Sequence, residues 1–386
     1  MRYLIIGNGI AGVEAAINIR KIDKKGNITI ITKSENLSYF RPRLIDYLAN
    51  KVTFKEIIAK QEDFYKEKRI KNLFNTKITD IRLEEKNIID SSGVTFKYDK
   101  LLLATGAKPF LPPIDGIDKK GVFAFRQKED ADNIKLFCKD KKDVAIVGGG
   151  LLGLEVANSL TILGKKVTII EYFNQLLPRQ LDEQGAEVLK TILERKGLSF
   201  KLGNITEKID GKGKVEKVIL KSGEIIKTGA VIISAGVRPR LELARNINVE
   251  INRGVKVNDY METSIKDIYA AGDIAEHRET NYGLWIPSKE QGEIAGKNMA
   301  GEKIKYKGSS IETRLKVTGI TLFSAGEFNA KDGEIKTLQK DNVFKKIIIK
   351  NKKLYGAIIL GDDKAAFLAS KIFNDKKYIN MLKEIL

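Results

Sequence analysis

Two copies of a glycine pattern restrict what this chain can fold into. In the first copy, an apolar run at residues 3–6 is followed by Gly7, Gly9 and Gly12, at the spacing Gly-x-Gly-x-x-Gly, and then by a helix-forming stretch. The first glycine permits a tight turn from strand to helix, the second lets a backbone approach a pyrophosphate, and the third lets helix and strand pack closely. The phosphates would meet the positive end of the helix dipole. The pattern therefore predicts a dinucleotide site.

The second copy follows a predicted strand at residues 144–147 and consists of Gly148, Gly150 and Gly153, again before a helix. A single match is weak evidence, because tight turns that bind nothing also contain glycines. Recurrence in the same strand–turn–helix context favours two dinucleotide sites. The predicted fold class is α/β, with two Rossmann-like dinucleotide-binding domains.

Composition narrows the class of protein further. The chain has 386 residues, 42% apolar and 31% charged, which is typical of a soluble globular protein of two or three domains. No apolar run has the length of a membrane span, and residues 3–16 are broken by Gly and Asn, unlike a signal peptide. We expect a cytoplasmic protein with no membrane partner. The single cysteine, Cys138, cannot form an internal disulfide, a zinc site or an iron–sulfur site, so no metal is expected.

The formal net charge of +19 has two interpretations. It is either a lysine-rich, solvated surface or a docking face for an acidic partner. Nucleic acid is not expected, because the sequence has no basic helix and no strand motif studded with aromatic residues.

An acidic residue about 20 residues after the third glycine binds a ribose hydroxyl in such folds. After the first copy, residues 28–32 are a predicted strand and Glu35 is the nearest acid, although a solvated turn residue is an equal alternative. After the second copy, residues 167–170 are a predicted strand and Glu171 follows it. A carboxylate there accepts hydrogen bonds from both ribose hydroxyls and repels a 2′-phosphate, which indicates NADH rather than NADPH. Arg179, a nearby basic residue, weakens that inference.

Residues 38–44 read Ser-Tyr-Phe-Arg-Pro-Arg-Leu, and two further segments end in Ala-Thr-Gly at Gly106 and in Ala-Gly-Asp at Asp273. With these segments the chain resembles FAD-dependent pyridine nucleotide oxidoreductases, the superfamily of glutathione reductase and lipoamide dehydrogenase. Thiol-dependent members carry redox-active cysteine near residues 38–44, where this chain has Arg-Pro-Arg. That departure argues against disulfide reductase, NADH peroxidase and cysteine-dependent NADH oxidase chemistry.

The pattern at residues 38–44, together with residues 316–326, is similar to NADH:rubredoxin reductases and to the flavin domain of NADH-dependent nitrite reductases. Ferredoxin reductases of oxygenase systems often carry Lys shortly after the Pro, where this chain has Asp46. The resemblance thus implies an FAD flavoprotein in which hydride passes from NADH to flavin N5. With no cysteine pair, electrons would leave singly to a small acidic redox protein, rubredoxin first. Alternatives are a ferredoxin-like protein, a nitrite-reductase-type partner, or a flavin sensor that binds NADH without turnover; a monomer or weak dimer is expected.

The resemblance also implies roles for individual FAD-binding residues. The Asp273 carboxylate would accept a hydrogen bond from a ribityl hydroxyl, and Arg41 would offset negative charge on reduced flavin, unless Arg41 and Arg43 are surface charges. A helix predicted at residues 288–298 would aim its N-terminus at the flavin. The implied FAD-binding residues are Gly7, Gly9, Ala11, Gly12, Glu35, Arg41, Pro42, Ala104, Thr105, Gly106, Gly272 and Asp273.

On the NADH side, the resemblance places Glu155 near the nicotinamide, whereas an ordinary acid in the first helical turn is the alternative. The implied NADH-binding residues are Gly148, Gly150, Leu151, Leu152, Gly153, Glu155, Glu171 and Gly236. No residue is assigned a certain catalytic role, because the flavin carries the chemistry; Glu155 and Trp285 are candidates. Trp285 is equally an interdomain core residue, and His277, the single histidine, is interpreted as a loop residue.

Prolines mark the domain boundaries, since four of the seven flank one inserted module: Pro109, Pro112, Pro113 and Pro239. We predict an FAD-binding domain at residues 1–113 and 238–305, and an NADH-binding domain at 114–237. In the NADH-binding domain, Cys138 lies on the apolar face of a helix at 129–139. A small α+β domain follows at 306–386, with strands at 317–324, 343–350 and 352–360, and helices at 363–373 and 377–386.

Overall fold

The computed structural model describes the chain except residues 310–311, 318, 331, 376–380, 383 and 386. It consists of two compact units. The first unit comprises Met1–Leu44, Val52–Lys108 and Val237–Ser309, and the second comprises Ile45–Lys51, Pro109–Gly236 and Ser310–Leu386. The parallel sheets described below confirm the α/β fold class. The division into three domains remains a prediction.

A five-stranded parallel sheet forms the centre of the first unit. Its strand order is β19-β7-β1-β2-β3, and its strands carry the apolar side chains of the largest core cluster. The strands are β1 (Arg2–Ile6), β2 (Asn27–Ile31), β3 (Ile70–Leu73), β7 (Lys100–Leu103) and β19 (Ile268–Ala270).

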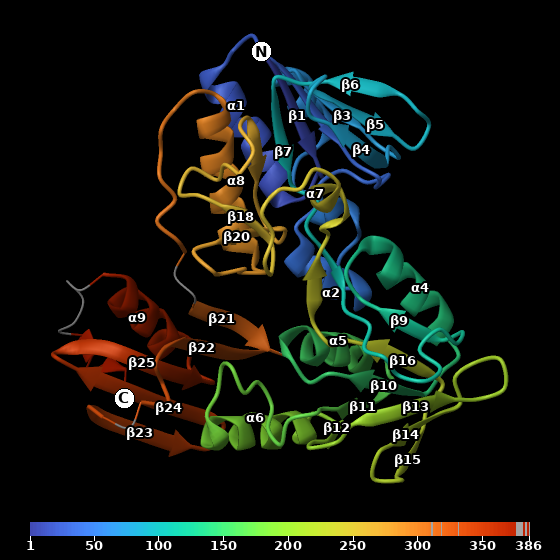
Figure 1. The fold of residues 1–386 in the computed structure, drawn as a ribbon. Coiled ribbons are helices and arrows are strands. Elements are labelled where there is room, and N and C mark those ends of the chain that lie inside the picture. Colours follow the sequence, from blue (N-terminus) through green and yellow to red (C-terminus); the bar gives the residue numbers. More distant parts are fainter. Residues whose placement is uncertain (310–311, 318, 331, 376–380, 383, 386) are drawn as a thin grey trace. The chain divides into compact units, whose positions relative to one another are not determined.

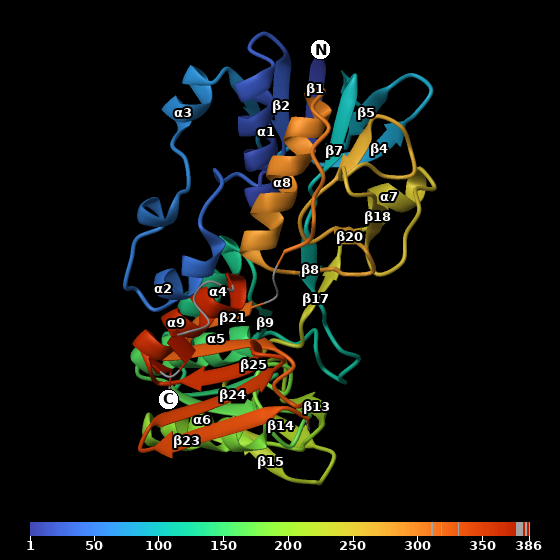
Figure 2. The same ribbon diagram turned by 90° about the vertical axis from the view of Figure 1, so that its left-hand side faces the viewer.

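Helices α1 (Ile10–Ile22) and α8 (Trp285–Met299) lie side by side in the first unit (Figures 1 and 2). A Cβ at Gly292 would overlap the backbone of Ala11, so the two helices pack closely at this glycine. Helix α8 begins at Trp285 rather than at the expected residue 288. Pro287 is tolerated there because backbone N–H groups in a first helical turn have no intrahelical acceptor.

Shorter elements complete the first unit. Strands β4 (Ile78–Arg82), β5 (Asn87–Asp90) and β6 (Thr95–Lys97) form an antiparallel sheet, β18 (Val255–Val257) pairs with β20 (Ala275–His277), and the connecting strands β8 (Ala107–Pro109) and β17 (Val237–Pro239) pair with each other. The helical turns are η1 (Arg41–Arg43), η2 (Lys55–Ile57), α3 (Glu62–Glu67) and α7 (Glu242–Asn246).

The second unit contains a parallel sheet with the order β12-β11-β10-β16-β9 and an antiparallel sheet of β13, β14 and β15. The strands are β9 (Val122–Ala124), β10 (Asp143–Val147), β11 (Lys166–Ile170), β12 (Leu198–Lys201), β13 (Thr206–Asp210), β14 (Lys217–Leu220), β15 (Ile225–Lys227) and β16 (Ala230–Ile233). The helices are α4 (Lys128–Cys138), α5 (Leu151–Ile162) and α6 (Glu183–Arg195). Within the described part of the chain, no helix is long and apolar enough to cross a membrane.

Residues Ile45–Lys51, which include most of α2 (Leu44–Leu48), belong to the second unit although they follow the Arg-Pro-Arg sequence directly. The Tyr47 hydroxyl donates a hydrogen bond to Asp132 at 2.6 Å, and the Lys135 ammonium lies 3.5 Å from the centroid of the Tyr47 ring. The Ser159 hydroxyl donates to the Ile45 carbonyl at 2.9 Å. Helices α4 and α5 therefore hold this segment.

The C-terminal part of the second unit is an antiparallel sheet with the order β21-β22-β25-β24-β23 and helix α9 (Asp363–Asn374). The strands are β21 (Glu312–Val317), β22 (Ile320–Gly326), β23 (Glu334–Lys340), β24 (Val343–Lys350) and β25 (Lys353–Leu360). The strand expected at 317–324 corresponds to β22, which begins later, at Ile320, because Gly319, with φ of +84°, precedes it. Strand β21, which ends at Val317, was not predicted. Thr318 and most of the helix expected at 377–386 lie outside the described residues.

The C-terminal sheet lies between two helices of the second unit, α6 and α9 (Figure 1). Successive residues of β24 reach opposite faces, as the pleat of a strand requires. Lys346 forms an ion pair with Asp182 at the start of α6, at 2.7 Å, whereas Lys345 pairs with Asp362 at the start of α9, at 2.9 Å. These partly buried pairs fix the sheet against both helices.

The first prediction concerns the contact between α1 and α8. Gly292→Ala should lower the melting temperature, because the new methyl group would overlap the Ala11 backbone and overpacking costs about 1–3 kcal/mol. That cost should exceed the gain of about 1 kcal/mol in helix propensity. Thermal unfolding by circular dichroism tests this, with Lys289→Ala on an exposed position of α8 as the matched control. Equal melting temperatures for the two variants would contradict the packing argument.

Candidate functional site

The first glycine turn lies between β1 and α1. Gly7 has φ of +117° and donates its N–H to the Ile31 carbonyl at 2.8 Å. A Cβ at Gly7 would overlap the Ala104 carbonyl, and one at Gly12 would overlap the Gly7 carbonyl. The first and third glycines are therefore required by the fold of the turn itself.

Gly9 differs from its neighbours because a Cβ built there would have no atom within 4 Å. It is the N-cap of α1, with φ of −68° and ψ of 179°, and α1 has neither a side-chain cap nor an acidic residue in its first turn. The N–H groups of that turn are therefore left without intrahelical acceptors at an open, positive helix end. This cradle fits the pyrophosphate of a dinucleotide.

The second glycine turn repeats this geometry between β10 and α5. Gly148 has φ of +110° and donates to the Ile170 carbonyl at 2.8 Å, and a Cβ at Gly153 would overlap the Gly148 carbonyl. Gly150 is the N-cap of α5, with no atom within 4 Å of a Cβ built there. Helix α5 also lacks a side-chain cap and an acid in its first turn. Each unit thus fits one dinucleotide.

Glu171, the predicted ribose ligand, is buried beside the second glycine turn. Its carboxylate accepts hydrogen bonds from the N–H of Gly149 at 2.5 Å and from the N–H of Phe173 at 3.0 Å. A carboxylate offers about four lone-pair positions, so these bonds leave capacity for ribose hydroxyls. Glu155 lies beyond the first turn of α5, so its alternative interpretation as a first-turn acid is wrong.

Several predicted FAD-binding residues gather at the carboxyl edge of the first sheet. Gly7 follows β1, Ala104 follows β7, and Gly272 follows β19. The Ser288 hydroxyl of α8 donates to the Asp273 carboxylate at 3.3 Å, which brings Asp273 to the first turns of that helix. The carboxyl edge of a parallel sheet is where nucleotides bind in such folds.

The segment at residues 38–44 presents buried polar atoms that have no hydrogen-bond partner in the described structure: the Ser38 hydroxyl and Nε of Arg41. The Ser38 side chain is 4% exposed. Unsatisfied buried polar groups cost free energy, so a bound ligand that supplies partners would be stabilised there. Ser38 is not among the predicted site residues, because nothing in its local sequence indicates that it is buried.

Trp285 contacts the same segment, with its ring edge-to-face on Phe40 at 4.9 Å between centroids. It occupies the first turn of α8, close in sequence to Ser288, which binds Asp273. The structure therefore brings the Arg-Pro-Arg sequence, Trp285 and Asp273 together within the first unit. On the NADH side, Gly236 has φ of +91° and no atom within 4 Å of a Cβ built there, as a close approach requires.

The structure corrects the interpretation of His277 as a loop residue. His277 ends β20, is 1% exposed, and its Nε2 lies 2.9 Å from the Asp259 carboxylate. Hydrogen bonds from Arg278 and His277 lower the pKa of Asp259 to about 2. The Tyr306 ring packs against the imidazole at 4.9 Å between centroids. These contacts give His277 a structural role in the first unit.

Glu35, the predicted ribose ligand of the first site, is exposed on the segment after β2. Thr105 lies shortly before β8, and its hydroxyl donates a hydrogen bond to the carbonyl of Arg240, which follows β17, at 3.1 Å. The neighbouring Gly106 has φ of +65° and open space around it.

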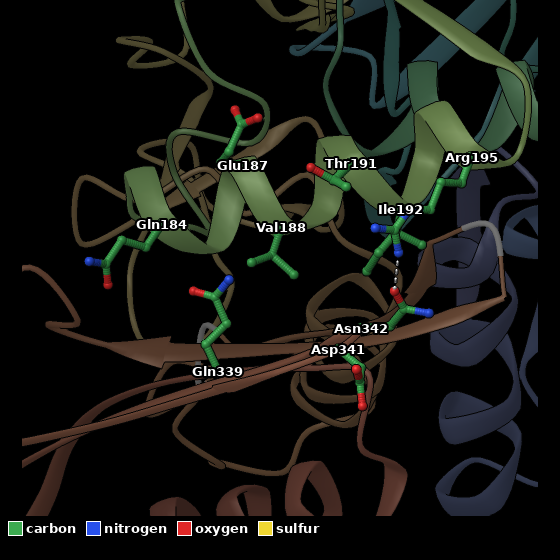
Figure 3. A pocket seen from close by; sticks show the side chains of 9 residues that line it. All are labelled: Gln184, Glu187, Val188, Thr191, Ile192, Arg195, Gln339, Asp341 and Asn342. Carbon is green, nitrogen blue, oxygen red and sulfur yellow. Dashed lines mark hydrogen bonds between the residues drawn. The ribbon is translucent and has the colours of Figure 1, made fainter.

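A pocket of about 320 Å³ lies elsewhere, between α6 and the turn from β23 to β24 (Figure 3). Arg195 crosses one end of it and donates a hydrogen bond to Asn342 at 3.3 Å. None of the predicted nucleotide ligands lines this pocket. Its lining residues are Gln184, Glu187, Val188, Thr191, Ile192, Arg195, Gln339, Asp341 and Asn342.

Comparisons with known proteins agree with this geometry. Residues 1–292 match the family model described as pyridine nucleotide-disulphide oxidoreductase, and residues 312–377 match the rubredoxin NAD+ reductase C-terminal domain. An NADH-rubredoxin oxidoreductase from Clostridium acetobutylicum is 32% identical over 385 residues, covering 100% of this chain and 97% of that protein. The crystal structure of that oxidoreductase aligns with a TM-score of 0.83 over 97% of this chain and 94% of its own.

A nitrite reductase [NAD(P)H] from Bacillus subtilis is 39% identical over 366 residues. The match covers 94% of this chain but 46% of that relative, so the chain spans about half its length.

The second prediction concerns Cys138, which is 2% exposed on the inner face of α4. Burial raises the pKa of its thiol to about 11, so thiolate is scarce near neutral pH. Cys138→Ser should retain full electron transfer from NADH to a soluble mediator. In the native wild-type protein a thiol reagent should react slowly, and rapidly after unfolding in guanidinium. A folded Cys138→Ser protein with greatly reduced activity would reveal a thiol mechanism.

Proposed function

Because this chain belongs to the pyridine nucleotide-disulphide oxidoreductase family, we propose that it binds FAD and NADH and passes electrons singly to a small redox protein, rubredoxin first. The observation that carries the proposal is the pair of equivalent, uncapped helix ends at Gly9 and Gly150. FAD would occupy the first unit and NADH the second. Bound FAD would supply the conversion of a two-electron hydride donor into single electrons.

The residues of the first unit would bind and orient FAD. The first turn of α1 would hold the pyrophosphate through its backbone N–H groups, and the Asp273 carboxylate would accept a ribityl hydroxyl. Arg41 places a cation in the segment that also carries the unsatisfied Ser38 hydroxyl. In the second unit, Glu171 would bind the NADH ribose and Gly236 would allow the nicotinamide to approach the backbone.

An external acceptor is proposed because the chain offers no cysteine pair, and its single thiol is buried in α4. Rubredoxin is preferred because the names of both the full-length relative and the C-terminal family model refer to it. A nitrite-reductase-type partner is the second candidate, favoured by the relative that continues beyond this chain. A ferredoxin-like acceptor, or a flavin sensor that binds NADH without turnover, would use the same sites.

The third prediction tests the core of this proposal. The purified protein should be yellow and carry one FAD, and anaerobic NADH should bleach the flavin absorbance rapidly. Subsequent oxidation by a mediator would exclude the sensor. Asp273→Ala should retain less FAD than the wild type while folding normally by circular dichroism. Reconstituted protein that holds FMN or no flavin would contradict the assignment of the first unit.

The fourth prediction concerns coenzyme choice. In Glu171→Gln, the preference for NADH over NADPH should fall by about fivefold or more, because two charges about 4 Å apart interact by about 1–4 kcal/mol, and 1.4 kcal/mol is tenfold. The rate of flavin reduction at equal subsaturating NADH and NADPH measures it. Glu183→Gln, at an exposed acid at the start of α6, is the control. A wild type that uses both coenzymes equally would overturn the role of Glu171.

The fifth prediction distinguishes electron transfer to the acceptor from reduction of the flavin by NADH. The +19 charge would raise encounter rates with an acidic protein, and salt shortens that attraction to about 8 Å at physiological ionic strength. Rubredoxin reduction should therefore slow steeply as salt rises, whereas flavin reduction by NADH should change little. Stopped-flow measurements of both steps across ionic strength test this. Two outcomes would contradict the choice of rubredoxin as the electrostatically attracted partner. One is slow reduction of rubredoxin alongside fast reduction of a mediator, and the other is a rate of rubredoxin reduction that does not depend on salt.

A further inference from the structure

The two glycine turns contain equivalent backbone hydrogen bonds, so each residue of one turn can be assigned to the equivalent position in the other. The N–H of the first glycine reaches the last residue of the second strand at 2.8 Å in both, from Gly7 to Ile31 and from Gly148 to Ile170. Gly7 and Gly148 are therefore equivalent positions. The residue that follows each of them is Asn8 in the first unit and Gly149 in the second.

The same matching extends to the residue after the second strand. The N–H of Thr32 donates to the Leu73 carbonyl at 2.9 Å, and the N–H of Glu171 donates to the Lys201 carbonyl at 2.9 Å. Thr32 thus stands in the first unit where the predicted ribose carboxylate, Glu171, stands in the second.

The two units have different residues at these two positions, and in each unit the sizes of the two side chains are complementary. In the second unit, Glu171 accepts the Gly149 N–H at 2.5 Å, and a Cβ at Gly149 would lie 3.2 Å from Oε2 of Glu171. That spacing is tighter than ordinary contact, so a small residue accompanies the carboxylate. In the first unit, the smaller Thr32 leaves room for a longer neighbour, and its hydroxyl donates to Oδ1 of Asn8 at 3.1 Å.

Asn8 also fixes the segment that leads to residues 38–44, because its Nδ2 donates to the Asn36 carbonyl at 2.7 Å. The two bonds use one N–H and one oxygen lone pair of the amide. An amide carries two of each, so within the described residues Asn8 retains a donor and an acceptor. Asn8 is half-buried at the turn, whereas Glu35 is exposed.

We propose that Asn8 and Thr32 are the neutral counterpart of Gly149 and Glu171, and that the Asn8 amide, rather than Glu35, binds the adenosine ribose of FAD in the first unit. This inference rests on the proposed function, since it takes FAD to be the ligand of that unit. The first site then recognises its ribose through an uncharged donor and acceptor, and the second through a carboxylate.

Titration of apoprotein with FAD, followed by flavin fluorescence, tests the inference without any turnover. Asn8→Gly should raise the dissociation constant for FAD about tenfold, whereas Glu35→Gln should leave it within about twofold. Thr32→Glu should also weaken binding, because the longer side chain crowds Asn8. The double variant Asn8→Gly/Thr32→Glu should recover most of the affinity, since it rebuilds the arrangement of Gly149 and Glu171.

Circular dichroism of each apoprotein separates binding from folding. If Asn8→Gly does not fold, Asn8→Ala decides the matter, because it restricts the backbone more than glycine does but removes both the amide donor and the amide acceptor, and it should also weaken FAD binding. Unchanged affinity in the folded Asn8 variant, or a loss confined to Glu35→Gln, would overturn the inference. A wild-type apoprotein that binds no FAD would instead overturn the proposed function.

Discussion

The contact between the third glycine of each turn and the carbonyl of the first determines how both nucleotide-binding units are built. At Gly12 and at Gly153 a Cβ would overlap that carbonyl, so the helix can leave its strand in this direction only when the side chain is absent. The same geometry leaves the helix N-terminus uncapped and opens the space above Gly9 and Gly150. The fold of each turn and its open helix end therefore depend on the same steric condition, which is the absence of a Cβ at Gly12 in the first unit and at Gly153 in the second.

Around the first turn, the parallel sheet gathers segments that are far apart in the sequence. Asp273 follows β19, Ser288 lies on α8, and the two are joined by a hydrogen bond at 3.3 Å. The same helix carries Trp285 onto Phe40, next to the cation of Arg41. Shortly after η1 the chain enters the second unit at Ile45, and there the Tyr47 hydroxyl donates a hydrogen bond to Asp132. The segment proposed to lie nearest the flavin is thus covalently continuous with residues held by helices α4 and α5.

The chemistry proposed for the chain follows from what these positions contain. The chain has no cysteine pair, and its single thiol is buried with its pKa raised to about 11. Electrons that reach the first unit would therefore need an acceptor outside the chain. The C-terminal sheet is held on α6 by the ion pair between Lys346 and Asp182, so it forms part of the same compact unit as the proposed NADH site.

Features that arise from local backbone geometry could be predicted from the sequence, namely both glycine turns and their flanking strands. These features are predictable because glycines at this fixed spacing are typical of only a few backbone structures. The environment of Ser38, the burial of His277 against Asp259 and the pairing of Asn8 with Thr32 became visible only in the folded structure. It also revealed β23, whose seven residues are all exposed and show no apolar alternation. These features depend on partners distant in the sequence, which no local pattern specifies.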